Sequence, residues 1–72
     1  MIAHEDGSQV LAAMRGLGDA DREVLALRFL IGLSEAECGS VLSVPSGTVK
    51  SRTSRALARL RLELDKESVH EL

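Results

Sequence analysis

The chain has 72 residues, of which 44% are hydrophobic, and it carries a net charge of -2, with one Phe and neither Trp nor Tyr. A chain this short forms one small domain and buries only about 60% of its unfolded surface. Its single cysteine excludes an intramolecular disulfide framework, no zinc-ligand spacing occurs, and no apolar run reaches the roughly 18 residues of a membrane span. We therefore expect a helical, cytoplasmic protein without metal or cofactor.

Charge is distributed unevenly along the chain. Residues 1–44 contain three basic and seven acidic side chains, residues 45–62 contain five basic and no acidic ones, and residues 63–72 contain one basic and four acidic ones. This asymmetry along the chain is more informative than the net charge. Because Trp and Tyr are missing, stacking of single-stranded bases on aromatic side chains is not expected.

Two helices are predicted in the acidic part of the chain. Apolar residues at helical spacing predict the first over residues 8–15, preceded by a disordered start or linker remnant over residues 1–7. The second is predicted over residues 19–31, where Asp19 and Asp21 suit the positive end of the helix dipole.

The second predicted helix is apolar on two sides. One stripe consists of Val24, Leu27 and Ile31, and the other of Leu25 and Phe29. Two core contacts within the domain would account for both stripes, and the alternative is that part of this surface meets a protein partner. For that alternative, the candidate partner-binding residues are Leu25, Arg28 and Phe29.

A capping box predicts the start of a third helix. Ser34 caps it, Glu37 reaches back to the cap, and the helix extends to about Leu42. The residues expected to face the core are Ala36, Cys38, Val41 and Leu42. Cys38 is interpreted as a small buried hydrophobic residue and not as a redox or metal-binding one. The segment SVPSG then breaks the helix, and Pro45 suits the first turn of the next.

The basic segment is predicted to form the longest helix, over residues 46–64. On a helical wheel, one arc forms the expected core face and contains Val49, Thr53, Ala56, Leu57, Leu60 and Leu64. Opposite this arc lie Ser51, Arg55 and Ala58, with Thr48 and Ser54 beside them. The flanks are basic, with Arg52 and Arg59 on one side and Lys50 and Arg61 on the other.

This arrangement fits the major groove of a DNA duplex, which is about 12 Å wide and admits one helix. Short side chains at the centre of the polar face allow a close approach to base edges, and basic flanks reach the phosphates. The free amides near Ser46 and Gly47, together with Thr48, could bind a phosphate at the helix start. A basic helix face is often merely solvated, but a capped short helix, a tight break and a longer basic helix are typical of a helix-turn-helix.

The segment DADREVLALRFLIGLSEAECGSVLSVPSGTVKSRTSRALARLR resembles the C-terminal promoter-binding domain, region 4, of bacterial sigma factors. The specific parts are REVLALRFLIGLS and VPSGTVKSRTSRALARLR, and GTVKSR points to the extracytoplasmic-function group. The resemblance implies a small all-α, four-helix domain with a helix-turn-helix and no wing. It would cover residues 8–66, with a frayed tail over residues 67–72.

The resemblance also implies a function. Region 4 docks in the major groove of the −35 promoter element while bound to the flap of the RNA polymerase β subunit, and so directs transcription initiation. The implied DNA-binding residues are Ser46, Gly47, Thr48, Lys50, Ser51, Arg52, Ser54, Arg55 and Arg59. The apolar second face of the predicted helix over residues 19–31 would suit the flap or an anti-sigma factor.

Several positions depart from the family pattern. The family usually has a large aliphatic residue at Cys38, Ala at Gly39, Gly at Ser43 and Leu or Ile at Thr53. Gly39 lowers helix propensity by about 1 kcal/mol relative to Ala, and Thr53 removes apolar volume from a core position, so we expect a looser domain. Ser43 is expected to need no left-handed conformation. Since a complete sigma factor also has a preceding domain for the −10 element, we expect this chain to be an excised domain.

Two alternative functions stay open. The first is a protein-interaction module, held by an anti-sigma factor or another regulator with DNA contact blocked. The second is an output domain of the response-regulator kind, which acts as a dimer on paired half-sites. An enzyme is not expected, because the sequence shows no nucleophile–base pairing, metal cluster or phosphate-cradling loop.

Overall fold

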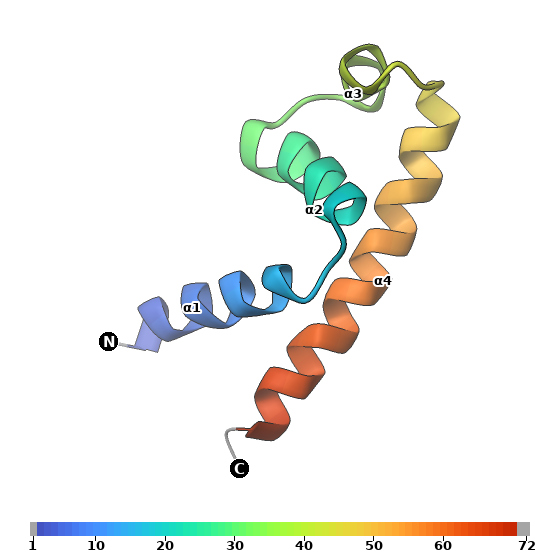
Figure 1. Cartoon of the computed structure of the whole chain (residues 1–72). Coiled ribbons are helices and arrows are strands. Elements are labelled where there is room, and N and C mark those ends of the chain that lie inside the picture. Colours follow the sequence, from blue (N-terminus) through green and yellow to red (C-terminus); the bar gives the residue numbers. More distant parts are fainter. Residues whose placement is uncertain (1, 71–72) are drawn as a thin grey trace.

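A computed structural model describes the backbone of residues 2–70 and the side chains of residues 9–66. The elements in chain order are α1 (Ile2–Arg15), α2 (Asp19–Leu25), the π-helical segment η1 (Ala26–Ile31), α3 (Glu35–Leu42) and α4 (Ser46–His70). No strand occurs within the described residues, so the predicted all-α class is confirmed. Figure 1 shows α4 as a long rod, and α1, α2 and α3 all pack against it.

The two terminal helices are longer than predicted. The 25 residues of α4, at about 1.5 Å per residue, account for most of the 42 Å length of the molecule. This helix begins at Ser46 as predicted but continues to His70, and α1 begins at Ile2 instead of Ser8. Residues 1, 71 and 72 lie outside the described residues, and the domain boundaries at residues 8 and 66 stay a prediction.

The core lies between α4 and the shorter helices. Its buried residues are Leu17, Val24, Leu25, Cys38, Val49 and Ala56. Cys38 is fully buried with a free thiol, as predicted. The prediction that Ala36 and Val41 face the core was wrong, because the short α3 turns only the side of Cys38 and Leu42 inward. Residues four positions apart share one face of a helix, and Val41 lies beside that face.

The second predicted helix has the expected limits, but half-way along it changes from an α-helix to a π-helix. After α2, the chain continues as the π-helix η1, which has no buried residue. The wider π turn rotates the last residues away from the core. Ile31, from the first of the two apolar stripes, is 65% exposed as a result. Gly32 then ends the helix with a left-handed φ of 88°.

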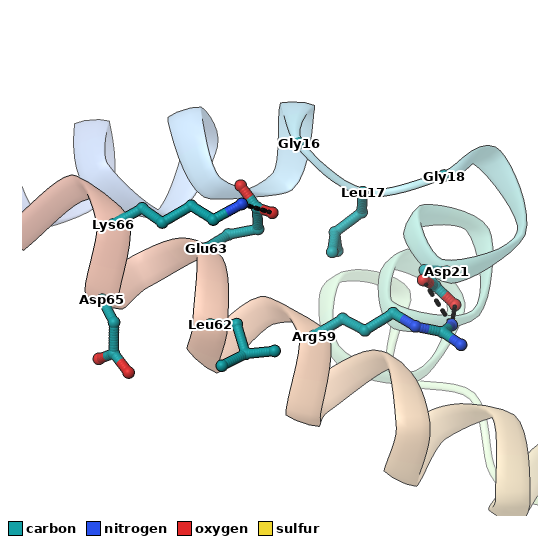
Figure 2. A pocket seen from close by; sticks show the side chains of 9 residues that line it. All are labelled: Gly16, Leu17, Gly18, Asp21, Arg59, Leu62, Glu63, Asp65 and Lys66. Carbon is teal, nitrogen blue, oxygen red and sulfur yellow. Dashed lines mark hydrogen bonds and ion pairs between the residues drawn. The ribbon is translucent and has the colours of Figure 1, made fainter.

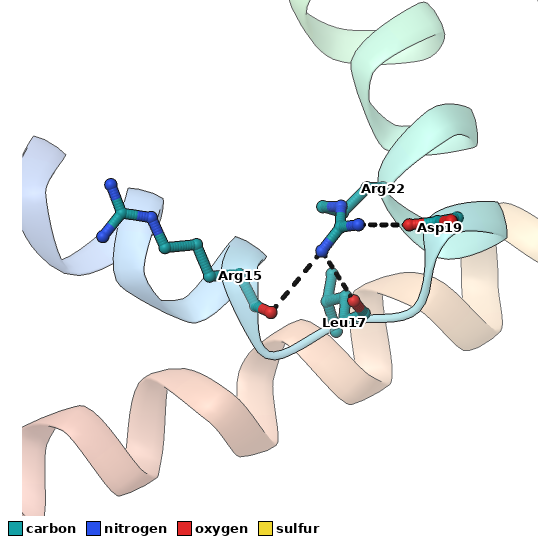
Figure 3. A network of polar contacts seen from close by, with 4 residues as sticks. All are labelled: Arg15, Leu17, Asp19 and Arg22. Atoms are coloured by element: carbon teal, nitrogen blue, oxygen red, sulfur yellow. Dashed lines mark hydrogen bonds and ion pairs between the residues drawn. The ribbon is translucent and has the colours of Figure 1, made fainter.

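Arg22 joins the start of α2 to the end of α1. Its guanidinium donates to the Leu17 carbonyl at 2.9 Å and to the Arg15 carbonyl at 3.5 Å, and it pairs with Asp19 (Figure 3). A cation is favourable here because the last carbonyls of a helix have no partner within the helix. These bonds hold the connection between α1 and α2 and thereby help to set how α2 lies along α4.

The predicted capping box of α3 is confirmed. The Glu37 amide donates to Ser34 Oγ at 3.0 Å, and the Ser34 amide donates to Glu37 Oε1 at 2.8 Å. Both donors would otherwise lack partners, because the first amides of a helix have no acceptor within the helix. The box therefore fixes where α3 begins.

The turn from α3 to α4 is held by the backbone. Ser43 ends α3 in the left-handed region, with φ 60° and ψ 44°, so the prediction that it needs no such conformation was wrong. The Val44 amide donates to the Gly39 carbonyl at 2.9 Å, and a Cβ atom at Gly39 would lie 2.6 Å from the Val44 carbonyl oxygen. The absent side chain of Gly39 thus permits a close turn, which the helix-propensity argument did not foresee.

Candidate nucleic-acid interface

The N-terminus of α4 presents free backbone donors. The Pro45 carbonyl accepts hydrogen bonds from the amides of Thr48 and Val49 at 3.0 and 3.2 Å, so the helical bonding starts there. The amides of Ser46 and Gly47 precede the first donor of this ladder and have no acceptor within the helix. Both residues are exposed. Together with the helix dipole, these amides can bind an anion such as a phosphate.

One side of α4 packs into the core. Val49 and Ala56 are fully buried, as predicted. Thr53 is 7% exposed, and its Oγ1 donates to the Val49 carbonyl at 2.7 Å. This bond satisfies the buried hydroxyl at a position where the family usually has a purely apolar side chain. Leu60 packs against the core, but Leu57 is 43% exposed and lies at the core's edge.

The opposite side of the first half of α4 is polar and open. Four of its residues are exposed, namely Lys50, Ser51, Ser54 and Arg55, and two are partly exposed, namely Thr48 and Arg52. Among the residues whose side chains the structure describes, no ion pair involves the three basic residues of this face. The predicted DNA-binding residues of this half of the helix therefore share one surface, with their charges uncompensated.

Arg59 differs from the other predicted DNA-binding residues. Its Nη1 donates to both carboxylate oxygens of Asp21, at 2.9 Å each. Figure 2 shows the side chain extending from α4 to Asp21 in α2. No local sequence pattern predicts this pair, because the two residues are 38 positions apart.

A second surface, here called the apolar groove, lies between α1, η1 and α4. Its lining residues are Val10, Leu11, Met14, Leu25, Phe29, Leu30, Leu57 and Leu60. Phe29 is 56% exposed and Leu30 is 80% exposed, so the groove includes apolar surface that is open to solvent. The contribution of α1 and Leu30 was not predicted, because it depends on how the helices are arranged.

Of the three candidate partner-binding residues, Phe29 is the one whose side chain is well exposed to solvent. Leu25 is only 4% exposed and belongs to the core, so it forms the floor of the apolar groove. Arg28 donates from Nη1 to the Leu33 carbonyl at 2.6 Å, and its guanidinium carbon lies 5.7 Å from the centre of the Phe29 ring. Arg28 thus supports the end of η1 and the position of Phe29.

Other kinds of site receive no support from the part of the chain that the structure describes. No group of three or more His, Cys, Asp or Glu side chains that could hold a metal ion is present among these residues. No described helix combines the length and the apolar character that crossing a membrane requires.

Comparison with known proteins identifies the family. Residues 13–62, which include α2, η1, α3 and the first two thirds of α4, match the family described as Sigma-70, region 4. The chain belongs to the sigma-70 region 4 family. Region 4 is a DNA-binding regulatory domain, and the predicted resemblance is therefore confirmed.

Curated relatives agree with this region 4 assignment. The chain is 42% identical over 62 residues to the RNA polymerase sigma-E factor of Streptomyces antibioticus, covering 86% of this chain and 34% of that protein. It is 39% identical over 61 residues to the RNA polymerase sigma-E factor of Streptomyces coelicolor, covering 85% and 34%. It is also 42% identical over 48 residues to the ECF RNA polymerase sigma factor SigW of Bacillus subtilis, covering 67% and 26%. The chain thus spans about a third of the length of the two sigma-E relatives. No solved structure matches significantly.

Proposed function

We propose that this region 4 chain recognises the −35 element of promoters for a sigma factor of the extracytoplasmic-function group, and so directs transcription initiation. The observation that carries this proposal is the first half of α4. There, Ser51 and Arg55 are exposed on the side opposite the buried Val49. The helix follows the capped α3 and a tight turn, which is the arrangement of a helix-turn-helix.

The side chains of this face suit the edges of base pairs. Arg55 has a planar fork of donors that matches the two acceptors of a guanine, and Lys50 can donate to the same atoms. Ser51 and Ser54 are short, so they allow the helix to come close to the bases, and their hydroxyls can donate or accept. In this proposal these residues read the sequence.

Contacts to the DNA backbone orient the helix. Arg52 on the flank and Thr48 at the helix start are placed to reach phosphates on the groove edges. The free amides of Ser46 and Gly47 add an anion site at the positive end of the helix dipole. Such contacts carry little sequence information, but they supply affinity and make binding sensitive to salt.

The apolar groove supports a second contact, with RNA polymerase. We propose that the flap of the polymerase β subunit binds at Phe29 and Leu30, whose apolar side chains are exposed. The groove borders the core side of α4, at Leu57 and Leu60, and not the side of Arg55. Both partners can therefore bind at once. An anti-sigma factor or another regulator that covers the same groove would compete with the flap and not with DNA, so the groove gives no support to the alternative in which DNA contact is blocked.

The DNA-binding proposal can be tested with a library of randomised duplexes. The chain should select one preferred sequence, and Lys50→Ala should weaken binding to it by about 1–3 kcal/mol, because a base contact is lost. Fluorescence anisotropy with labelled duplexes gives the affinity. Arg15→Ala, which removes the same charge from α1, is the control and should change the affinity much less. A failure to select any sequence, or equal losses in the two variants, would contradict the proposal.

The proposal for the apolar groove needs a separate measurement. Phe29→Ala should weaken binding of the chain to an isolated polymerase β flap and leave the affinity for the selected duplex unchanged. Val41→Ala is the matched control, because Val41 is 60% exposed but lies outside the groove. If Phe29→Ala and Val41→Ala bind the flap equally well, the flap does not bind in the groove.

A further inference from the structure

The ion pair between Asp21 and Arg59 lies next to the proposed DNA-binding face. It connects the first turn of α2 to the second half of α4, across the hollow drawn in Figure 2. A single nitrogen of Arg59, Nη1, donates to both Asp21 oxygens. The other guanidinium donors, on Nε and Nη2, make no hydrogen bond to the described residues. They are left to bind another anion.

The two partners of this pair differ in exposure. The Asp21 side chain is 15% exposed, whereas the Arg59 side chain is 56% exposed. The carboxylate is therefore mostly shielded from solvent, whereas the guanidinium can reach solvent. An anion that draws Arg59 away would leave a largely buried carboxylate without its partner, which is unfavourable.

Arg59 continues a row of basic residues along α4. It follows Arg55 by four positions and Arg52 by seven, so the three side chains lie on neighbouring parts of one helix face. Within the described part of the chain, Arg52 and Arg55 form no ion pair, and only the third member of the row faces a carboxylate. The Asp21 carboxylate therefore offsets the positive charge of this row at Arg59.

We propose that Asp21 limits the affinity of the chain for DNA by competing with a backbone phosphate for Arg59. This inference rests on the proposed function and specifies which residue tunes it. Carboxylate and phosphate oxygens are alternative acceptors for the same guanidinium donors. While it is paired with Asp21, Arg59 contributes less to DNA binding than an unpaired arginine of the same row.

The test is the salt dependence of duplex binding by the 72-residue chain. Asp21→Asn removes the competing charge at constant shape, so the variant should bind more tightly and depend more steeply on salt. One additional phosphate contact multiplies the ratio of the affinities at 50 and 200 mM salt by about 3.5. Asp19→Asn is the control: Asp19 is 96% exposed, lies in the same turn and pairs with Arg22. It should leave the ratio unchanged.

A second comparison does not depend on how well Asp21→Asn folds. Arg52→Gln should lower the same ratio by about 3.5-fold, because it removes a phosphate contact. Arg59→Gln should lower it clearly less. Equal reductions in these two variants would overturn the inference, and so would an unchanged ratio in Asp21→Asn with its helical circular dichroism intact. A chain that binds duplex without any salt dependence would instead reject the proposed function itself.

Discussion

The two halves of α4 use their charged residues differently. In the first half, the side chains of Lys50, Arg52 and Arg55 form no ion pair within the described residues. In the second half, Arg59 pairs with Asp21 at 2.9 Å and Lys66 pairs with Glu63 at 3.2 Å. The basic residues of the first half are available to a ligand, whereas in the second half only Arg61 is, because Arg59 and Lys66 are paired within the described part of the protein.

The reason for this difference is how each half is held. The start of α4 is fixed by the backbone turn at Ser43 and Val44, and by the buried side chains of Val49 and Ala56. It needs no salt bridge to stay in place. The second half extends beyond the compact α3, and the side chain of Arg59 connects it to Asp21 of α2. The number of basic residues along a helix is therefore larger than the number that are free to bind DNA.

The largest expected effect separates the two halves directly. Arg55→Ala should weaken binding to the selected duplex by about 1–3 kcal/mol, because an unpaired guanidinium on the polar face is lost. Lys66→Ala, an equal change of charge in the second half, should have a much smaller effect. Anisotropy titrations of both variants at one salt concentration measure the difference. Equal losses would show that the halves are equivalent.

The turn that positions the first half can be broken at Gly39. Gly39→Ala would place a Cβ atom 2.6 Å from the Val44 carbonyl oxygen, and the backbone would have to move. We expect a loss of about 1–3 kcal/mol in the free energy of unfolding, measured with urea, which exceeds the gain in helix propensity. Gly47→Ala is the control, because nothing lies within 4 Å of its Cβ position. It should stabilise the chain by up to about 1 kcal/mol.

The same turn can be strengthened at Ser43. A left-handed residue other than glycine is strained by about 1 kcal/mol, so Ser43→Gly should raise the midpoint of thermal unfolding by about 4–8 °C. Ser40→Gly, in the exposed part of α3, should lower it, because glycine is a poor helix former. A destabilised Ser43→Gly variant would mean that the conformation at this position costs little in this chain.

The smallest effect concerns the stability that the second half gains from its ion pair. Arg59→Ala should lower the free energy of unfolding by about 0.2–1 kcal/mol, because the pair is partly exposed and screened by water. Arg61→Ala is the control: Arg61 is exposed and has no ion pair among the described residues, so no loss is expected. A larger loss for Arg59→Ala would make the pair a main structural contact.

Short-range patterns predicted much of the secondary structure. The Ser34–Glu37 capping box, the break at Pro45 and the limits of the helix over residues 19–31 all depend on neighbouring residues, and the structure confirms them. The exposed face at Ser51 and Arg55 also followed from helical periodicity. Predictions failed where packing decided the backbone conformation or the buried side of a short helix, as at Ser43, Ala36 and Val41.

Amino-acid order alone therefore accounts for the helices, the helix-turn-helix and the polar face of α4, since each depends on contacts within a few positions. The arrangement of the helices in space settled the rest. It brought Asp21 to Arg59 and formed the apolar groove from α1, η1 and α4. It also left Leu57 at the edge of the core. Such pairings join residues far apart in the chain, and they depend on how the helices pack against α4, which no local spacing of residues encodes.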